Sequence, residues 1–134
     1  MSKIRVGVVG YSAKKFDKEK ARAMIEKTLD LLKEDIEIVS GLTYLGVPAI
    51  AYDIAKERGL RTVGVACPKA EEYECFPVDE KVIEGKDWGD ESEKFLSMID
   101  VMIKVGGGAQ SVAEAKKARE MGLTVIEYDL PILP

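Results

Sequence analysis

Apolar residues along the chain follow two patterns, short continuous runs and longer stretches with helical spacing. The continuous runs are rich in Val and Ile, as is typical of strands covered on both faces. They predict strands at residues 3–12, 36–41, 61–67, 101–105 and 123–129. In the stretches between them, apolar residues recur three or four positions apart, which predicts helices. These helices are expected at residues 16–35, 46–59 and 110–122.

Capping residues mark the expected ends of these helices. Asp17 is a plausible N-cap for the first helix, and Pro48 suits the first turn of the second. Gly59 suits the C-terminal cap of that second helix. Residues 68–100 are less regular, with a short additional strand expected at 81–85 and a helix from Asp90 to Asp100.

Strands that alternate with helices over the whole length predict an α/β fold with a doubly wound, mostly parallel sheet and helices on both faces. A Rossmann-like fold is therefore expected. With 134 residues, the chain is expected to form a single nucleotide-binding domain over residues 1–134. Right-handed crossovers place the loops that follow the strands at the carboxyl edge of the sheet, where such folds bind ligands.

Composition narrows the classes of function. The net charge of −4 disfavours general binding to nucleic acid or to anionic membranes, and no apolar run is long enough to span a membrane. The two cysteines have no disulfide or zinc spacing, so we expect a cytoplasmic protein without a metal site or another cofactor. Because the chain has no histidine, His-dependent nucleophilic pairs are excluded.

The segment VGGGAQSVAE, residues 105–114, carries the strongest functional signal. Three glycines let a ligand approach the backbone closely, and the helix that follows directs free N–H groups to the same place. This arrangement predicts a phosphate site. The alternative for Ser111 and Glu114 is a capping box, in which Glu114 only satisfies a backbone N–H group.

The standard nucleotide motifs are absent from the sequence. The first loop, GVVGYS, lacks GxGxxG, and Ser40 stands where a dinucleotide-binding strand would end in an acidic residue. The chain also lacks GxxxxGK[ST]. The predicted site therefore rests on the loops after the strands. Its candidate ligand-binding residues are Gly10, Ser12, Ser40, Gly41, Thr43, Gly46, Gly106, Gly107, Gly108, Gln110 and Ser111, with Glu114 as the candidate catalytic residue.

Three further side chains have two alternative roles, one in ligand binding and one in the structure. Trp88 could stack on a base, and Asp90 or Glu91 could bind ribose hydroxyls or a cation. The favoured alternative is that Asp90 and Glu93 cap a helix on which Trp88 packs.

Residues 40–55 and 104–120 resemble the SLOG superfamily, which includes DNA-processing protein A and the Lonely Guy phosphoribohydrolases, long labelled lysine decarboxylase-like. Those hydrolases carry PGGxGTxxE, with glycines and threonine on phosphate and glutamate at the N-glycosidic bond. Gly107 and Gly108 match the glycine pair, Ser111 the threonine and Glu114 the glutamate. Gln110 replaces the third glycine.

The resemblance implies a nucleotide-binding protein that is similar to the small stand-alone members of the superfamily. The first predicted function is binding of a nucleotide or nucleotide derivative through the glycine-rich loops. The alternative is a phosphoribohydrolase that cleaves the N-glycosidic bond of a nucleoside 5′-monophosphate. The arginine typical of those enzymes has no clear match in this sequence, which disfavours hydrolysis. SLOG relatives commonly assemble, so a homo-oligomer is expected.

Overall fold

Six parallel strands form the central sheet of the protein. The computed structural model describes residues 3–32 and 35–134. Within them the sheet order is β4-β3-β2-β1-β5-β6, and every pair of neighbours is parallel. This confirms the predicted doubly wound α/β class. The strands are β1 (Ile4–Gly10), β2 (Ile36–Ser40), β3 (Arg61–Ala66), β4 (Glu80–Ile83), β5 (Val101–Val105) and β6 (Thr124–Tyr128).

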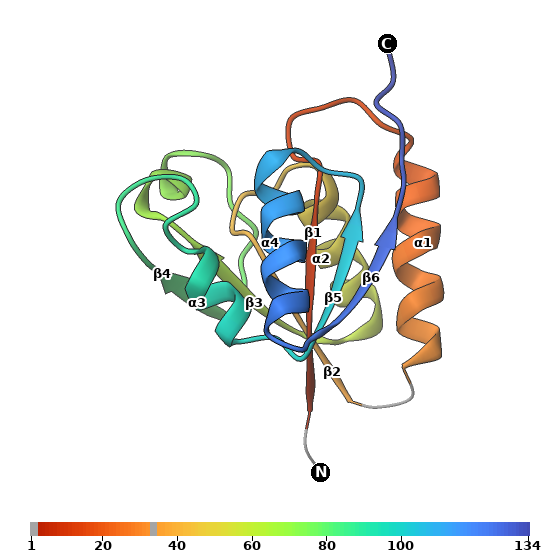
Figure 1. Ribbon diagram of the computed structural model, residues 1–134, viewed down its shortest axis with the longest axis horizontal. Helices are drawn as coiled ribbons and strands as arrows, with labels where there is room; N and C mark the ends of the chain where they lie inside the picture. Colours follow the sequence, from red (N-terminus) through yellow and green to blue (C-terminus); the bar gives the residue numbers. More distant parts are fainter. Residues whose placement is uncertain (1–2, 33–34) are drawn as a thin grey trace.

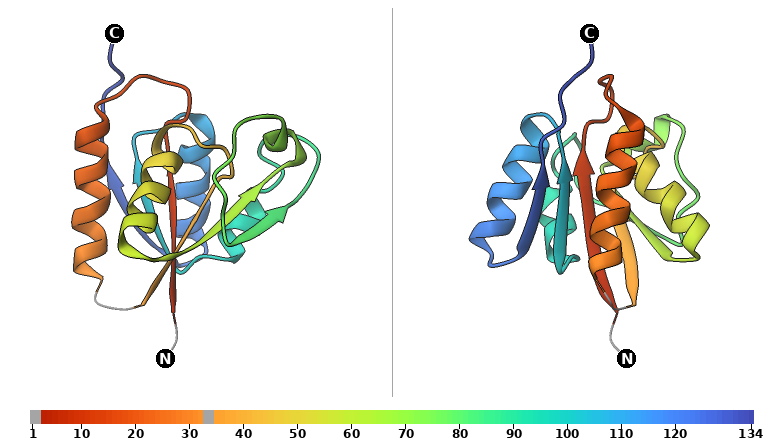
Figure 2. Two further views of the ribbon diagram at one scale, coloured as in Figure 1. Left: turned by 180° about the vertical axis from the view of Figure 1, so that it is seen from behind. Right: turned by 90° about the vertical axis from the view of Figure 1, so that its right-hand side faces the viewer.

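Helices cover both faces of this sheet (Figures 1 and 2). One face carries α1 (Lys18–Leu31) and α2 (Gly46–Arg58), which pack side by side. The other face carries the short α3 (Ser92–Ser97) and α4 (Ala109–Glu120). A 3-10 helix, η1 (Pro68–Glu72), follows β3 and has no counterpart in the predicted elements. The right-hand view of Figure 2 shows the sheet between the two helical layers.

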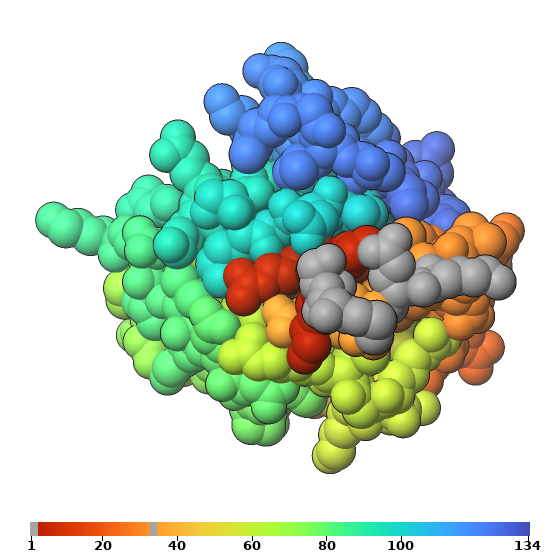
Figure 3. Space-filling view, turned by 90° about the horizontal axis from the view of Figure 1, so that it is seen from below, coloured from red at the N-terminus to blue at the C-terminus, as the bar shows by residue number. Residues whose placement is uncertain are grey.

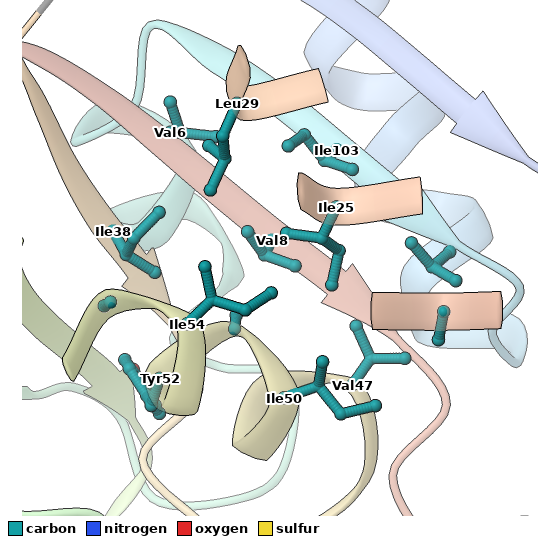
Figure 4. Packing of buried hydrophobic residues seen from close by; sticks show 14 of the residues in the cluster. Val6, Val8, Ile25, Leu29, Ile38, Val47, Ile50, Tyr52, Ile54 and Ile103 are labelled. Atoms are coloured by element: carbon teal, nitrogen blue, oxygen red, sulfur yellow. The ribbon is translucent and has the colours of Figure 1, made fainter. Parts of the chain in front are cut away.

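The larger core lies between the sheet and the α1–α2 layer. In Figure 4, Ile25 and Leu29 of α1 and Ile54 of α2 face Val6 and Val8 of β1. All five side chains are buried, which explains the near-continuous apolar sequence of β1. The second core, on the opposite face, joins Phe95 and Ala118 of the other layer to the sheet.

The helix ends agree with the sequence at some positions and not at others. Asp17 caps α1 as predicted, because its Oδ1 atom accepts from the Lys20 N–H at 3.1 Å. Gly59 ends α2 in the left-handed conformation, also as predicted. The first helix, however, ends at Leu31 instead of continuing to residue 35, and residues 33–34 lie outside the described part.

The prediction that Asp90 and Glu93 cap a helix from residue 90 is wrong. The helix α3 begins at Ser92 without a side-chain cap. The Asp90 carboxylate instead accepts the backbone N–H groups of Lys86 and Asp87, both at 2.9 Å, and closes the preceding turn. A local turn competes with the cap for the same carboxylate, and this competition cannot be seen in the sequence pattern.

Charged residues gather where the first four strands begin, at the edge seen from below in Figure 3. Glu37 of β2 is nearly buried between Arg5 and Arg61 on the neighbouring strands, with carboxylate-to-guanidinium distances of 3.0 and 3.6 Å. Glu80 also forms ion pairs with both arginines, 3.8 Å from Arg5 and 3.1 Å from Arg61. This network places paired opposite charges along the amino edge of the sheet.

In residues 3–32 and 35–134, none of the helices is both long and apolar enough to cross a membrane.

Candidate functional site

A cavity of about 330 Å³ opens at the carboxyl edge of the sheet. The chain runs from β1 through β2 and β3 to β4 in one direction and then returns to place β5 on the other side of β1. Ligands of open α/β sheets bind beside such a reversal of strand order. The cavity is lined by the ends of β1, β2 and β3, by the loop after β2, by residues 88–95 and by the start of α4.

A larger hollow of about 780 Å³ lies elsewhere, beside α2 and the start of β3. Its lining mixes cations such as Lys56 and Arg61 with the carboxylates of Asp53 and Asp79, and it includes none of the glycine loops. In it, the Asp53 carboxylate is already occupied by the Tyr44 hydroxyl at 2.6 Å. We therefore place the candidate site in the smaller cavity, at the edge where the loops converge.

Two of the predicted glycines present bare backbone to this cavity. Gly41, after β2, and Gly108, before α4, both line it. A methyl group added at either position would meet no atom of the described protein within 4 Å. Packing within the protein therefore does not require glycine at these two positions, whereas close approach of a ligand would.

Three other predicted glycines shape the loops without lining the cavity. Gly46 has φ +57° and lies against the backbone of Tyr11 and Ser12. Gly106, with the same φ, lies against the Tyr11 ring, and Gly107 lies against the Ser111 side chain. The fold itself thus explains these glycines. Their contact with a ligand remains a prediction.

Hydroxyl groups from separate loops converge on the cavity. Ser12, Ser40, Thr43 and Ser111 all line it, and so does Gly10. The buried Ser40 hydroxyl donates to the Val8 carbonyl at 2.6 Å, so only its acceptor capacity is left for a ligand. The Ser111 hydroxyl makes a longer bond, 3.4 Å, to the carbonyl of Gly10. It can be redirected to a ligand at smaller cost.

Tyr52 of α2 holds the loop that carries Gly41. Its ring is buried and stacks on Phe76, with the two ring centroids 4.7 Å apart. Its hydroxyl donates to the carbonyl oxygens of Gly41, at 2.7 Å, and of Val63, at 3.0 Å. Tyr52 therefore ties the loop after β2 to the sheet without touching the cavity.

Glu114 lies in a side-chain cluster at one side of the cavity. Its Oε2 atom accepts from the Ser92 hydroxyl at 2.8 Å and from the Gln110 amide at 3.5 Å. The same Gln110 amide donates to Glu91 at 3.3 Å. The capping-box alternative for Ser111 and Glu114 is wrong, because α4 begins at Ala109 with Gly108 at the N-cap position and no side-chain cap.

Burial raises the pKa of the Glu114 carboxyl above its usual range. Hydrogen bonds from Ser92 and Gln110 oppose this rise, and the nearby Glu91 carboxylate adds to it. Glu114 is only 8% exposed. A carboxyl group whose pKa is shifted by burial inside a cavity is a common mark of a functional site.

Glu114→Gln is therefore expected to stabilise the protein at neutral pH. The folded-state pKa of Glu114 lies above the unfolded one, so its ionisation lowers the free energy of unfolding as pH rises above about 4.3. Below that pH the carboxyl is protonated in both states and the penalty disappears. Urea unfolding of both proteins between pH 4 and 8 should show a stability difference that grows with pH. A difference that is constant or shrinks with pH would contradict the burial argument.

The segment 88–95 contains the cavity residues whose roles were hardest to predict from the sequence. Trp88 lines the cavity, is 48% exposed and tilts against the Tyr73 ring, with the two ring centroids 6.0 Å apart. Phe95 lines the cavity from α3, and Ser92 enters through its bond to Glu114. No local motif marks Ser92, because its partner lies 22 residues away.

The polar lining determines which chemistry the cavity can support. Among the residues that the structure describes, its lining contains no lysine or arginine. An anionic group would therefore rely on hydroxyls and on the N–H groups of the first turn of α4, which have no partner within the helix. The carboxylates of Glu91 and Glu114 in the same lining favour hydrogen-bond donors of a ligand. Cys67 is fully buried and lies outside the lining.

The topology and the position of the cavity define a Rossmann-like α/β protein with a cavity at the carboxyl edge of its sheet. No family model matches the sequence, and a search of curated proteins finds no match. Similar solved structures do exist. The molybdenum cofactor binding protein from the phototrophic bacterium Rippkaea orientalis has 22% sequence identity and a TM-score of 0.81, over 96% of this chain and 78% of that one.

The Moco carrier protein from Chlamydomonas reinhardtii is similar as well. One of its structures has 24% identity and a TM-score of 0.77, over 97% of this chain and 79% of that one. Another has 26% identity and a TM-score of 0.75, over 95% of this chain and 76% of that one. At these identities the likeness establishes the Rossmann-like fold of this chain.

Proposed function

We propose that the protein binds a phosphorylated heterocyclic ligand, a nucleotide or a phosphorylated pterin, and releases it unchanged, as a carrier or sensor does. One observation carries this proposal. The cavity brings together glycine backbone, hydroxyls, a helix N-terminus, an aromatic ring and two buried carboxylates. Its volume of about 330 Å³ lies within the range of small-molecule sites.

The phosphate would lie at the start of α4, near Gly108 and Ser111. Backbone N–H groups and hydroxyls can hold an anion there without a cationic side chain. Ser12 and Gly41 line the same cavity from the loops after β1 and β2, and would bind the ligand from the facing side. The heterocycle would then lie toward Trp88.

The likeness to proteins named for the molybdenum cofactor supports the pterin form of the proposal. That cofactor is a phosphorylated pterin, so it offers both an anionic group and an amino-bearing ring. The hydroxyl and backbone N–H groups of the lining suit the first, and the Glu91 and Glu114 carboxylates suit the second. Membership of the SLOG superfamily and assembly as a homo-oligomer belong to the same proposal and are compatible with the fold.

The buried Glu114 also favours a second candidate, hydrolysis of an N-glycosidic bond. Departure of the base leaves positive charge on the ribose, which a carboxylate stabilises while water attacks. This step would need a positive charge to hold the phosphate. The described lining includes Trp88, Glu91 and Gln110, and none of these side chains is a cation. We rank this candidate second for that reason.

The test is thermal unfolding of the protein with GMP, AMP, a phosphorylated pterin and ribose 5-phosphate, followed by chromatography of each ligand. A ligand that binds without turnover should stabilise the protein by about 2.7 kcal/mol at a hundredfold excess over Kd, and the same ligand should be recovered intact. Free base and ribose 5-phosphate, absent with Glu114→Gln, would establish the hydrolase instead. If no compound raises the unfolding temperature, the proposal is overturned.

A further inference from the structure

One carboxylate oxygen of Glu114 has no hydrogen-bond donor among the described residues. Both hydrogen bonds to the carboxylate, from Ser92 and from Gln110, go to Oε2. Among the residues that the structure describes, no group donates to Oε1. The residue is only 8% exposed and lines the cavity. Among the described residues no fully buried side-chain oxygen lacks a partner, so Oε1 is an accessible atom of this largely buried residue, and a ligand in the cavity can donate to it.

The surrounding groups fix the direction of that oxygen. Ser92 on α3 and Gln110, one turn before Glu114 on α4, hold the Oε2 side of the carboxylate. The neighbouring Glu91 is fully engaged, because Oε1 accepts from Gln110 at 3.3 Å and Oε2 from the Gly89 N–H at 3.0 Å. Of the two carboxylates, Glu114 is thus the one with an oxygen that no described protein group donates to.

We propose that Glu114 accepts hydrogen bonds from the edge of a heterocycle on which a ring N–H stands beside an exocyclic amino group, as in guanine and pterins. This inference rests on the proposed function. Trp88 and Phe95 line the same cavity and offer flat apolar surfaces for such a ring. The anionic part of the ligand would then reach the glycine and hydroxyl side.

The chemistry of the ring edge discriminates between common nucleotides. Guanine presents two adjacent donors to a carboxylate, whereas hypoxanthine has the ring N–H but lacks the amino group. Adenine places an acceptor nitrogen where guanine has its N–H, so it would face the Glu114 carboxylate with like polarity. A site whose acceptor binds a donor of the ligand discriminates strongly against analogues that lack this donor. An apolar site discriminates less strongly against a ligand of changed shape.

The experiment is isothermal titration of the intact protein with GMP, IMP and AMP. The unmodified protein should bind GMP about ten- to hundredfold more tightly than IMP, which corresponds to one hydrogen bond to a charged group. Binding of AMP should be weaker still. With Glu114→Gln, the affinity for GMP should fall toward that for IMP. Glu120→Gln, an exposed change of equal charge on the same helix, should keep the full preference for GMP.

The possible results separate this inference from the proposed function. Equal affinity for GMP and IMP, or a preference that survives Glu114→Gln, would overturn the role of Glu114 while nucleotide binding itself stands. Failure of every nucleotide and of the phosphorylated pterin to bind would overturn both.

Discussion

Replacing Gly46 by alanine is expected to lower the free energy of unfolding by about 2 to 5 kcal/mol. Its φ of +57° alone costs a residue with a Cβ about 1 to 2 kcal/mol. In addition, the new methyl would meet the carbonyl oxygen of Tyr11 and the backbone of Ser12. Overpacking of this kind costs about 1 to 3 kcal/mol, and backbone atoms cannot move aside as a side chain can.

The same contact attaches α2 to the loop after β1, because the Val47 N–H donates to the Tyr11 carbonyl at 2.8 Å. Gly59, at the other end of α2, is the matched control. Its φ is +69°, but an added methyl would meet no described atom within 4 Å. Denaturant unfolding should therefore show a loss of only about 1 to 2 kcal/mol for Gly59→Ala. Equal losses for the two variants would refute the close contact at Gly46.

Replacing Gly108 by alanine should weaken ligand binding about ten- to hundredfold and leave stability almost unchanged. Gly108 has a φ of −92°, which suits any residue, and an added methyl meets no described atom within 4 Å. The methyl would instead separate the phosphate from the N–H groups at the start of α4. Loss of one hydrogen bond to a charged group accounts for the expected factor.

The measurement is titration with GMP beside denaturant unfolding, and Gly122→Ala is the control at the far end of α4. Gly122 has a φ of +83° and lies outside the cavity lining. Its alanine variant should lose about 1 to 2 kcal/mol of stability and bind GMP normally. Unchanged GMP affinity in Gly108→Ala would remove the phosphate from this end of the helix.

The strands and longer helices could be predicted because their signals are local. Continuous Val and Ile runs and helical spacing follow from burial on both faces or on one, and all the runs named as strands form sheet strands. Asp17 and Gly59 cap helices through their own neighbours in the chain. The convergence of the loops after β1, β2 and β5 also followed, because parallel strands with right-handed crossovers allow one placement of these loops.

The assignment of roles within the cavity depended on contacts between distant segments. The sequence shows Gly46, Gly106 and Gly108 as equivalent small residues. The structure separates them, because the first two lie against Tyr11 and the third faces open space. Likewise, S-x-x-E at residues 111–114 indicated a cap, but the start of α4 at Ala109 placed Glu114 beside Ser92 instead.

By itself, the sequence determined a doubly wound α/β domain with a glycine- and hydroxyl-rich carboxyl edge, since local periodicity and chain handedness suffice for that. Only the tertiary structure decided which glycines pack against protein and which face the cavity, and which oxygen of Glu114 is left free. These properties depend on segments such as 88–95 and the loop after β2, which meet α4 in space but not along the chain. Their packing, rather than any spacing in the sequence, selects the residues available to a ligand.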